Sequence, residues 1–327
     1  MRDAANMSPE EKMKALEKNT VEIINKENLY DLFSSRQPVA YCGYEPSGEI
    51  HLGHLVTITK LMELQQLGCR VKVLMADWHG WLNQKGNWEE MDKSVKMWIK
   101  GFKAAGLEKA EFIKGSSFQR SPEYMDDLMK IAVDTTMKRA LRSMQQVARD
   151  IEHAKVSQVI YPLMQICDIK HLGVDIVESG IEQRKIHMLG LEVFDKIGYK
   201  KPVLVHTPLI ASLKGPGGKM SSSEQGSFIS IRDDETSMKN KINKAYCPEG
   251  EVKENPVLEI ARLIIFPRVE EFLIERPDKF GGSLSYTSYA DLEKDFREKK
   301  LHPLDLKNAL AKYLYEILKP IGDKVKD

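Results

Sequence analysis

Two histidines at a turn between a strand and a helix are the side chains best placed to do chemistry. His51 and His54 are three residues apart, so both project from one side of a helix start. A strand is expected at 39–44, a Pro-Ser-Gly turn follows it, and the helix is expected to end near Leu67. The free N–H groups of a helix start suit an anion such as a triphosphate, and Gly53 leaves space for a flat ring. The pattern alone is equally compatible with two surface histidines.

A glycine-rich loop supplies a second candidate group. The segment Gly215-Pro216-Gly217-Gly218 precedes Lys219-Met220-Ser221-Ser222-Ser223. Such a loop is mobile and carries a positive charge, so it can close over phosphate groups when they are present. The two segments together therefore favour a nucleotide-phosphate site over two unrelated surface features.

The spacing of these segments resembles that of a known family. HLGH at 51–54 and KMSSS at 219–223 look like the HIGH and KMSKS signatures of class I aminoacyl-tRNA synthetases. The segments at 41–54, 76–86, 161–169, 182–187 and 302–308 are similar to tyrosyl-tRNA synthetases of the archaeal and eukaryotic type. The resemblance covers nearly the whole chain. It differs at Ser222, where the family signature carries a second lysine.

The resemblance implies a set of residues for the first step, the joining of an amino acid to ATP. The catalytic groups are expected to be His51, His54 and Lys219. The residues expected to bind ATP are Gly43, His51, Gly53, His54, Lys219, Met220, Ser221 and Ser222. The residues expected to bind tyrosine are Tyr41, Glu45, His79, Tyr161, Gln165, Asp168 and Gln183, with Tyr41 and Asp168 on the phenol hydroxyl. Mg²⁺ is expected with ATP, but the sequence shows no carboxylate cluster that would hold a metal.

The resemblance also implies residues that contact tRNA(Tyr). The candidates are Arg142, Arg184, Lys185, Phe280, His302, Asp305 and Lys307. Phe280 is expected to stack on an unpaired base, and Asp305 is expected to accept hydrogen bonds from a guanine. By spacing alone, a solvated charged face is the default explanation for Arg142, and His302 fits an ordinary helix start.

The order of expected elements predicts an α/β fold. A strand, a helix and a second strand at 71–76 form a β-α-β unit, which implies a Rossmann-like parallel sheet with helices on both faces. Residues 1–230 are expected to form the catalytic domain, with an inserted helical segment at about 110–158. Residues 231–327 are expected to form a mostly α-helical anticodon-binding domain. The family implies a homodimer formed through the inserted segment.

Several helices are predicted from capping residues and prolines. Helices are expected at Met7–Asn25, Trp88–Ala105 and Tyr124–Arg149, and another is expected to begin at Pro162. In the C-terminal part, helices are expected at Asn255–Phe266, Tyr289–Glu298 and Pro303–Leu318, the last ended by Pro320.

Composition limits the classes of function. The chain has 327 residues, a net charge of +1 and 30% charged residues, which is typical of a soluble globular protein. The sequence contains no apolar run long enough to cross a membrane. The four cysteines lack the C-x-x-C spacing of a zinc site, and a reduced cytoplasm is the simplest setting.

Other functions fit parts of the pattern. A tryptophanyl-tRNA synthetase shares the signatures, but it gives no reason to pair Tyr41 with Asp168. A small-molecule nucleotidyltransferase can share the histidine turn and the parallel sheet without an RNA-reading domain. An inactive RNA-binding relative is expected to have lost His51, His54 or Lys219, and none of these is missing.

Overall fold

The computed structural model describes residues 7–144, 155–221, 224 and 226–326. The chain folds into two compact units. Unit 1 contains residues 1–47, 60–99 and 107–208, and unit 2 contains residues 48–59, 100–106 and 209–327. The described residues of the segment that begins at residue 209 therefore belong to the same unit as the C-terminal helices. The division into a catalytic domain and an anticodon-binding domain at residue 230 stays a prediction.

Unit 1 is built on a six-stranded sheet with the order β1-β6-β5-β2-β3-β4. All neighbours pair in parallel except β1 and β6, which are antiparallel. The strands are β1 (Glu22–Ile24), β2 (Val39–Tyr44), β3 (Arg70–Met75), β4 (Glu111–Lys114), β5 (Ile176–Gly180) and β6 (Val203–Thr207). The expected parallel sheet is confirmed, and the antiparallel edge strand β1 is an addition that the sequence did not indicate.

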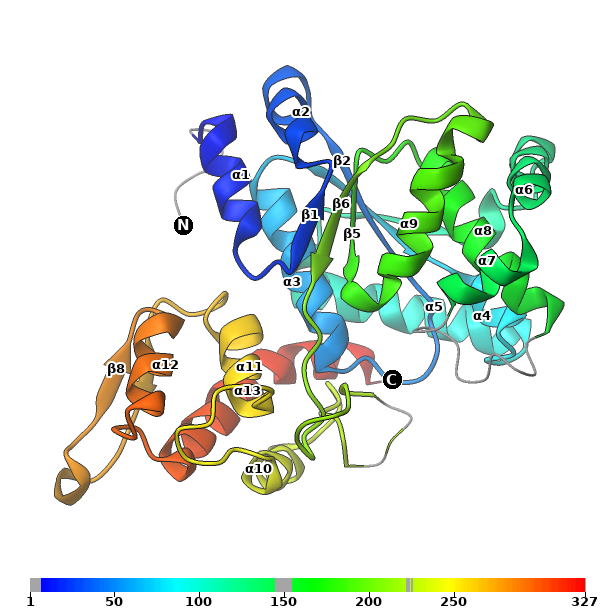
Figure 1. Cartoon of the computed structure of the whole chain (residues 1–327). Coiled ribbons are helices and arrows are strands. Elements are labelled where there is room, and N and C mark those ends of the chain that lie inside the picture. The colour runs from blue at the N-terminus through cyan, green and yellow to red at the C-terminus, as the bar shows by residue number, and fades with distance from the viewer. Residues whose placement is uncertain (1–6, 145–154, 222–223, 225, 327) are drawn as a thin grey trace. The chain divides into compact units, whose positions relative to one another are not determined.

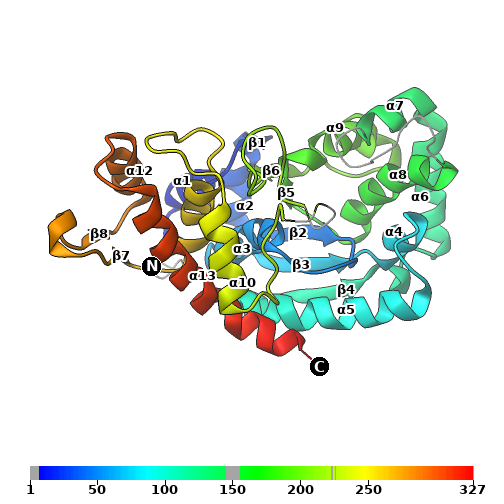
Figure 2. The ribbon, with the colours of Figure 1, turned by 90° about the horizontal axis from the view of Figure 1, so that it is seen from below.

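The β2-α3-β3 unit follows the prediction closely. Helix α3 (Leu52–Gln66) ends just before Gly68, whose φ of 93° favours glycine. After β3 the chain enters α4 (Asp77–Leu82), then α5 (Trp88–Phe102) and the π-helical turn η3 (Lys103–Leu107). Figure 2 shows α4 beyond the ends of β2 and β3, and α4 packs against α8 (Val156–His171).

Helices lie on both faces of the sheet, as expected. Figure 1 shows α1 (Pro9–Glu17) and α2 (Leu29–Ser35) on one side of β1 and β6, with α8 and α9 (Arg184–Val193) on the other. Tyr41, Leu74, Val177 and Leu204 point from four neighbouring strands into one buried cluster with α8, α9 and α6 (Pro122–Asp134). This cluster fixes the position of α8, which carries three of the seven expected tyrosine-binding residues, Tyr161, Gln165 and Asp168.

Three helix predictions in unit 1 are wrong in extent. The helix expected at Met7–Asn25 ends at Glu17, and β1 follows. The helix expected from Tyr124 is divided into α6 and α7 (Met137–Ser143), because Thr135 is extended and Thr136 caps α7 by accepting the Arg139 N–H. The rest of that expected helix, including Arg149, lies outside the described residues.

Pro162 does not begin a helix but lies inside α8, which begins at Val156. A proline there removes one backbone hydrogen bond and costs about 3 kcal/mol. Leu163, Ile166 and Ile169 are buried, and each contributes about 1.5–3 kcal/mol by burial. Their packing outweighs the lost bond, so the helix continues through the proline.

Unit 2 is mostly helical and also contains a short hairpin. Its helices are α10 (Glu235–Lys244), α11 (Pro256–Ile260), which continues into the π-helical turn η7 (Ala261–Ile265), α12 (Tyr289–Arg297) and α13 (Pro303–Val325). Strands β7 (Phe272–Ile274) and β8 (Leu284–Tyr286) pair antiparallel. Pro320 was expected to end the last helix, but α13 continues to Val325 because Leu318 and Ile321 are buried on either side.

Short segments from earlier in the chain complete unit 2. The Leu52 N–H donates to the Ile229 carbonyl at 3.1 Å, and the Ile231 N–H donates to the Ile50 carbonyl at 3.1 Å. A Cβ on Gly101 would lie 2.7 Å from Cδ1 of Ile50. The described part of the chain contains no helix that is both long and apolar enough to cross a membrane.

Candidate functional site

The sheet order places several polar residues at one edge. From β2 the chain proceeds outward to β3 and β4, whereas β5 and β6 lie on the opposite side of β2. Ligands of open parallel sheets bind where the order reverses, at the carboxyl ends of the strands. Glu45 follows β2, His79 follows β3 and Gln183 follows β5 closely. The topology therefore brings three expected tyrosine-binding residues to this edge.

Tyr41 and Gly43 share one face of β2, as the alternation of a strand predicts. Tyr41 is buried, and a Cβ on Gly43 would lie only 2.6 Å from the Tyr41 hydroxyl oxygen. Glycine at this position therefore leaves the space that the phenol ring of Tyr41 occupies. Burial raises the pKa of Tyr41 well above 10, and the charge of Asp168 raises it further.

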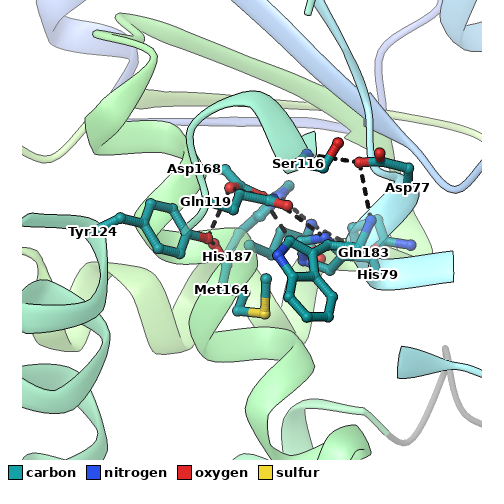
Figure 3. A network of polar contacts seen from close by, with 11 residues as sticks. Asp77, His79, Ser116, Gln119, Tyr124, Met164, Asp168, Gln183 and His187 are labelled. Carbon is teal, nitrogen blue, oxygen red and sulfur yellow. Dashed lines mark hydrogen bonds and ion pairs between the residues drawn. The ribbon is translucent and has the colours of Figure 1, made fainter. Parts of the chain in front are cut away.

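Asp168 lies at the centre of a buried hydrogen-bond network (Figure 3). Its Oδ1 accepts from Nε2 of Gln119 at 2.8 Å and from the Tyr124 hydroxyl at 2.9 Å. The Tyr124 oxygen also lies 2.8 Å from the Met164 carbonyl oxygen. One carboxylate oxygen is therefore held in place by two side chains from outside α8.

Other polar atoms in this network have no hydrogen-bond partner. They are Oδ2 of Asp168, Nε2 of His79 and Oε1 of Gln119. Nε2 of His79 lies 3.7 Å from Oδ2 of Asp168, beyond hydrogen-bond distance. Buried polar groups without partners are costly and rare, so a group of them is best explained by a ligand that completes the bonding.

Burial controls the charges in this network. It lowers the pKa of His79 to about 4, so the imidazole is neutral at pH 7. It raises the pKa of Asp168 to about 7, although the bonds from Gln119 and Tyr124 favour the charged carboxylate. A donor such as a phenol hydroxyl would therefore meet a carboxylate that is close to its titration point.

Asp77 ties the surrounding loops together. Its Oδ1 accepts from the backbone N–H groups of Trp78 at 3.0 Å and Ser116 at 2.8 Å. Asp77 begins α4, whereas Ser116 lies in η4 (Gly115–Ser117), just before Gln119. This buried carboxylate positions the two segments that carry His79 and Gln119.

A second polar group lies where α8, η5 (Ile181–Gln183) and α9 meet. Nε2 of Gln165 lies 3.4 Å from Oε1 of Gln183 and 3.5 Å from Nε2 of His187. The ring centres of Tyr161 and His79 are 4.6 Å apart at 86°. The residues expected at the two ends of a bound tyrosine thus lie within one continuous group of side chains.

Unit 2 carries the histidine signature. Nδ1 of His54 accepts the His51 N–H at 3.1 Å, and Nδ1 of His51 accepts the Gly53 N–H at 3.1 Å. Burial lowers the pKa of His51 to about 4, and the charge of Lys219 lowers it further. Both rings are therefore neutral at pH 7, with the proton on Nε2, so each can donate one hydrogen bond.

The loop that contains Lys219 also belongs to unit 2. Lys219 pairs with Ala211 in an antiparallel bridge, and the Met220 N–H donates to the Ile210 carbonyl at 2.8 Å. Met220 is buried, whereas Lys219 is exposed, so the buried methionine anchors the loop beside its lysine. Ser221 is half-buried, and Ser222 lies outside the described residues.

Comparison with known proteins shows the family of this chain. Residues 34–319 match the family model described as tRNA synthetases class I (W and Y). The chain is 48% identical to a tyrosine–tRNA ligase of Methanococcoides burtonii, over 95% of this chain and 98% of that one. It is similar to a crystal structure of a tyrosyl-tRNA synthetase from Archaeoglobus fulgidus, with 47% identity, 97% and 100% coverage and a TM-score of 0.94. The chain belongs to the tyrosyl-tRNA synthetase family.

The tryptophanyl relatives are more distant. A tryptophanyl-tRNA synthetase from Giardia lamblia has a TM-score of 0.71 and 18% identity, covering 93% of this chain and 82% of that one. This similarity shows a shared fold alone. The Aeropyrum pernix tyrosyl-tRNA synthetase, at 39% identity and a TM-score of 0.87, covers 97% of this chain.

The residues that the family resemblance assigns to tRNA lie in both units. In unit 1, Arg142 is exposed on α7, Lys185 is half-buried on α9, and Nε of Arg184 donates to Glu22 at 2.5 Å. In unit 2, Phe280 is 59% exposed, with the Lys279 ammonium 4.9 Å from its ring centre.

The start of α13 holds the other three. Nδ1 of His302 accepts the Leu304 N–H at 3.1 Å, so His302 caps the helix. Asp305 lies half-buried in the first turn. The Lys307 ammonium donates to the carbonyls of Asn243 and Ala245 at the end of α10, which gives this lysine a structural contact.

Sequence reasoning missed Gln119, Tyr124 and Asp77. Asp77 directly follows β3, the same signal that identified His79. Gln119 lies in a short irregular segment and Tyr124 in an ordinary helix start, so neither had a sequence signal. Trp78, the next residue after Asp77, packs with Trp81 and Trp88, at ring-centre distances of 5.0 and 5.4 Å.

Proposed function

We propose that this chain is a tyrosine–tRNA ligase, which activates L-tyrosine with ATP and transfers the tyrosyl group to tRNA(Tyr). The observation that carries the proposal is the Asp168 carboxylate, with one oxygen held by Gln119 and Tyr124 and the other buried without a partner. A tyrosine phenol can supply the missing donor, whereas a phenylalanine ring cannot. The related Archaeoglobus fulgidus structure is a complex with L-tyrosine, which supports this assignment.

The two ends of the substrate are assigned to different groups. Tyr41 and Asp168 bind the phenol hydroxyl, with His79 beside them. Tyr161, Gln165 and Gln183 bind the α-ammonium group, and Glu45 lies near Tyr161, where burial and then the charge of Glu45 raise the pKa of the Tyr161 phenol. Nδ2 of Asn83 donates to Oε2 of Glu45 at 2.7 Å, which holds this carboxylate in place.

The first step needs position and charge stabilisation more than covalent catalysis. The tyrosine carboxylate attacks the α-phosphorus of ATP, the bond to the bridging oxygen breaks, and pyrophosphate leaves. His51 and His54 each donate an Nε2–H to phosphate oxygens as negative charge grows. Lys219 approaches the leaving pyrophosphate when its loop closes. Gly43, Gly53, Met220 and the serines Ser221 and Ser222 are assigned to ATP contacts.

Mg²⁺ is proposed to arrive with ATP. The described residues contain no group of three His, Cys, Asp or Glu side chains that could hold a metal ion. Mg²⁺ is commonly held by substrate phosphates with few protein ligands. The ion would offset phosphate charge, including the charge that a lysine at Ser222 offsets in the common family signature.

The second step needs the 3′ end of tRNA(Tyr). A ribose hydroxyl attacks the carbonyl carbon of tyrosyl-adenylate, and AMP leaves. Arg142, Arg184 and Lys185 are assigned to phosphates of the acceptor end, and Phe280, His302, Asp305 and Lys307 to the anticodon. This assignment makes 1–230 the catalytic domain and 231–327 the anticodon-binding domain.

An exposed apolar stripe supports the proposed homodimer. Met125, Met129 and Val133 are spaced four residues apart on α6 and are 40%, 52% and 86% exposed. Residues at this spacing share one helix face, and Met137 at the start of α7 is 66% exposed. Exposed apolar patches of this kind mark interfaces, and a second copy is the proposed partner. Light scattering of Val133→Glu against the unchanged chain tests this surface.

The cytoplasm is the proposed location. Cys42, Cys69, Cys167 and Cys247 are all buried and free of disulfides. Free buried thiols are usual in reducing compartments.

Pyrophosphate exchange into ATP with each of the twenty amino acids tests the proposed function. Exchange that depends on tyrosine supports it. Exchange with tryptophan alone would favour the tryptophanyl alternative, and exchange with none of the amino acids would favour a different nucleotidyl transfer.

A further inference from the structure

A chain of side chains connects Gln165, through two buried histidines, to the surface of unit 1. Nε2 of Gln165 contacts Nε2 of His187 at 3.5 Å, and Nδ1 of His187 lies 2.9 Å from Nε2 of His206. Nδ1 of His206 lies 2.8 Å from Oε1 of Glu22. His187 and His206 are 2% and 0% exposed, so solvent does not compete for the bond between these two rings.

The four residues come from separate elements: α8, α9, β6 and β1. The ring centres of His187 and His206 are 5.2 Å apart and their planes differ by 14°, so the N–H of one ring lies near the plane of both. The antiparallel pairing of β1 with β6 sets Glu22 opposite His206 in the sheet. The edge strand β1 thus delivers a carboxylate to a buried histidine pair.

The carboxylate determines the direction of every bond in the chain. A carboxylate only accepts, so Nδ1 of His206 carries a proton and donates to Glu22. Burial lowers the pKa of both histidines, that of His187 to about 3, so each ring is neutral and has one N–H. Nε2 of His206 then accepts a hydrogen bond from the Nδ1–H of His187. Because that is the one N–H of the His187 ring, Nε2 of His187 has no proton and accepts from Gln165.

This direction also orients the Gln165 amide. Nε2 of His187 and Oε1 of Gln183 are both acceptors facing Gln165, so its NH₂ group must lie toward them. With the amide reversed, its oxygen would face two acceptors. We infer that Glu22, through His206 and His187, is a positioning residue that turns the Gln165 oxygen toward the α-ammonium group of the bound amino acid. This inference rests on the proposed tyrosine activation.

The tautomers can be measured directly on the full-length chain. In long-range ¹H–¹⁵N spectra of protein labelled at histidine, His187 and His206 should each show a protonated Nδ1 and an unprotonated Nε2 at pH 7. Loss of signals in His187→Phe and His206→Phe assigns them. A protonated Nε2 on His187 would overturn the inference, and this test needs no variant to retain activity.

Binding provides the second test, with Glu22→Gln as the variant. A glutamine can present its NH₂ to His206 and reverse the chain, so the dissociation constant for tyrosine should rise about tenfold or more. The dissociation constant for 3-(4-hydroxyphenyl)propanoate, which lacks the amino group, should change less than about twofold. Equal weakening of both ligands would show a general structural role and overturn the inference.

A matched control removes the same charge elsewhere. Glu17 is exposed and pairs with Lys26, outside this chain of bonds, so Glu17→Gln should leave both dissociation constants unchanged. Failure of the unchanged chain to bind tyrosine would contradict the proposed function instead. The measurements are made without tRNA, because Glu22 also contacts Arg184.

Discussion

The phenol oxygen of Tyr124 lies 2.9 Å from Oδ1 of Asp168, and the two residues come from different helices. This contact, together with the Gln119 amide, fixes one oxygen of the carboxylate and leaves the other for a ligand. The selectivity of the pocket should therefore depend on Asp168, and the position of Asp168 is set by Gln119 and Tyr124, which lie outside its own helix α8.

Asp168→Ala should lower kcat/KM for tyrosine strongly and change phenylalanine activation little. The phenol and Tyr41 would each lose a partner, and a buried polar group without one costs about 1–3 kcal/mol. The ratio of the two kcat/KM values should fall about a hundredfold in pyrophosphate exchange. Tyr124→Phe, which keeps the carboxylate, should cause a smaller fall. An Asp168→Ala variant that still prefers tyrosine would contradict the assignment.

The preference for tyrosine should also depend on pH. Burial raises the pKa of Asp168 to about 7, so the carboxylate gains a proton as pH falls through 7 and can no longer accept freely. The ratio of kcat/KM for tyrosine to that for phenylalanine should therefore be highest above about pH 8 and fall about tenfold by pH 6. Titration of His51 and His54 would affect kcat/KM for both amino acids equally, so their contribution cancels in the ratio. A ratio that is constant from about pH 6 to pH 8 would exclude titration of Asp168 in this range.

Lys219→Ala should slow formation of the adenylate and leave the affinity for tyrosine nearly unchanged. The lysine is exposed on its loop, and its proposed role is to contact the leaving pyrophosphate when the loop closes. Loss of a group that acts mainly in the transition state lowers kcat with little effect on KM. Rapid-quench measurement of a single turnover, repeated at several tyrosine concentrations, gives the rate of adenylate formation and the affinity for tyrosine. A raised KM for tyrosine with an unchanged kcat would argue against the loop-closure role.

Replacing both Arg184 and Lys185 by alanine should weaken tRNA charging and flatten its dependence on salt. Each lost phosphate contact removes the release of about one counterion. Pyrophosphate exchange without tRNA should change less than charging. Lys93→Ala, on the exposed face of α5, is the control and should alter neither measurement. An equal fall in exchange and charging would mean that these residues act on the amino-acid pocket alone.

Asp305→Ala should reduce charging of a tRNA that has guanosine at the first anticodon position, and it should narrow the advantage of guanosine over other bases. Asp305 is half-buried in the first turn of α13, where one carboxylate can accept two guanine N–H bonds. Charging of transcripts with each of the four bases measures the preference. If the preference is unchanged, another residue reads that base.

The sheet and its signature turn could be predicted because their patterns are local. Strand β2 has the predicted bounds Val39–Tyr44, since its apolar run ends at a Pro-Ser-Gly turn. The helix boundaries predicted at Pro162 and Pro320 were wrong for one shared reason. Local rules place proline at helix boundaries, whereas the packing of neighbouring apolar residues in the folded chain keeps both helices intact.

The candidate site could be predicted only where residues follow strand ends or known signatures. His79, Asp168 and Gln183 were predicted in this way. Gln119 and Tyr124 reach Asp168 from 49 and 44 residues away, through a fold that no local pattern encodes. The edge strand β1 was missed for a related reason, because three half-buried residues give too little alternation to identify a strand.

The composition of unit 2 has a consequence for how this protein can be divided. Residues 48–59 and 100–106 belong to it, and Ile50 and Leu52 supply backbone bonds to Ile231 and Ile229. A fragment that begins at residue 209 would contain Ile229 and Ile231 but would lack Ile50 and Leu52, their backbone hydrogen-bond partners. Unit 2 therefore cannot be moved between proteins as one continuous segment without residues 48–59 and 100–106. The segment with the histidine signature and the C-terminal helices have to be transferred together in any exchange of unit 2.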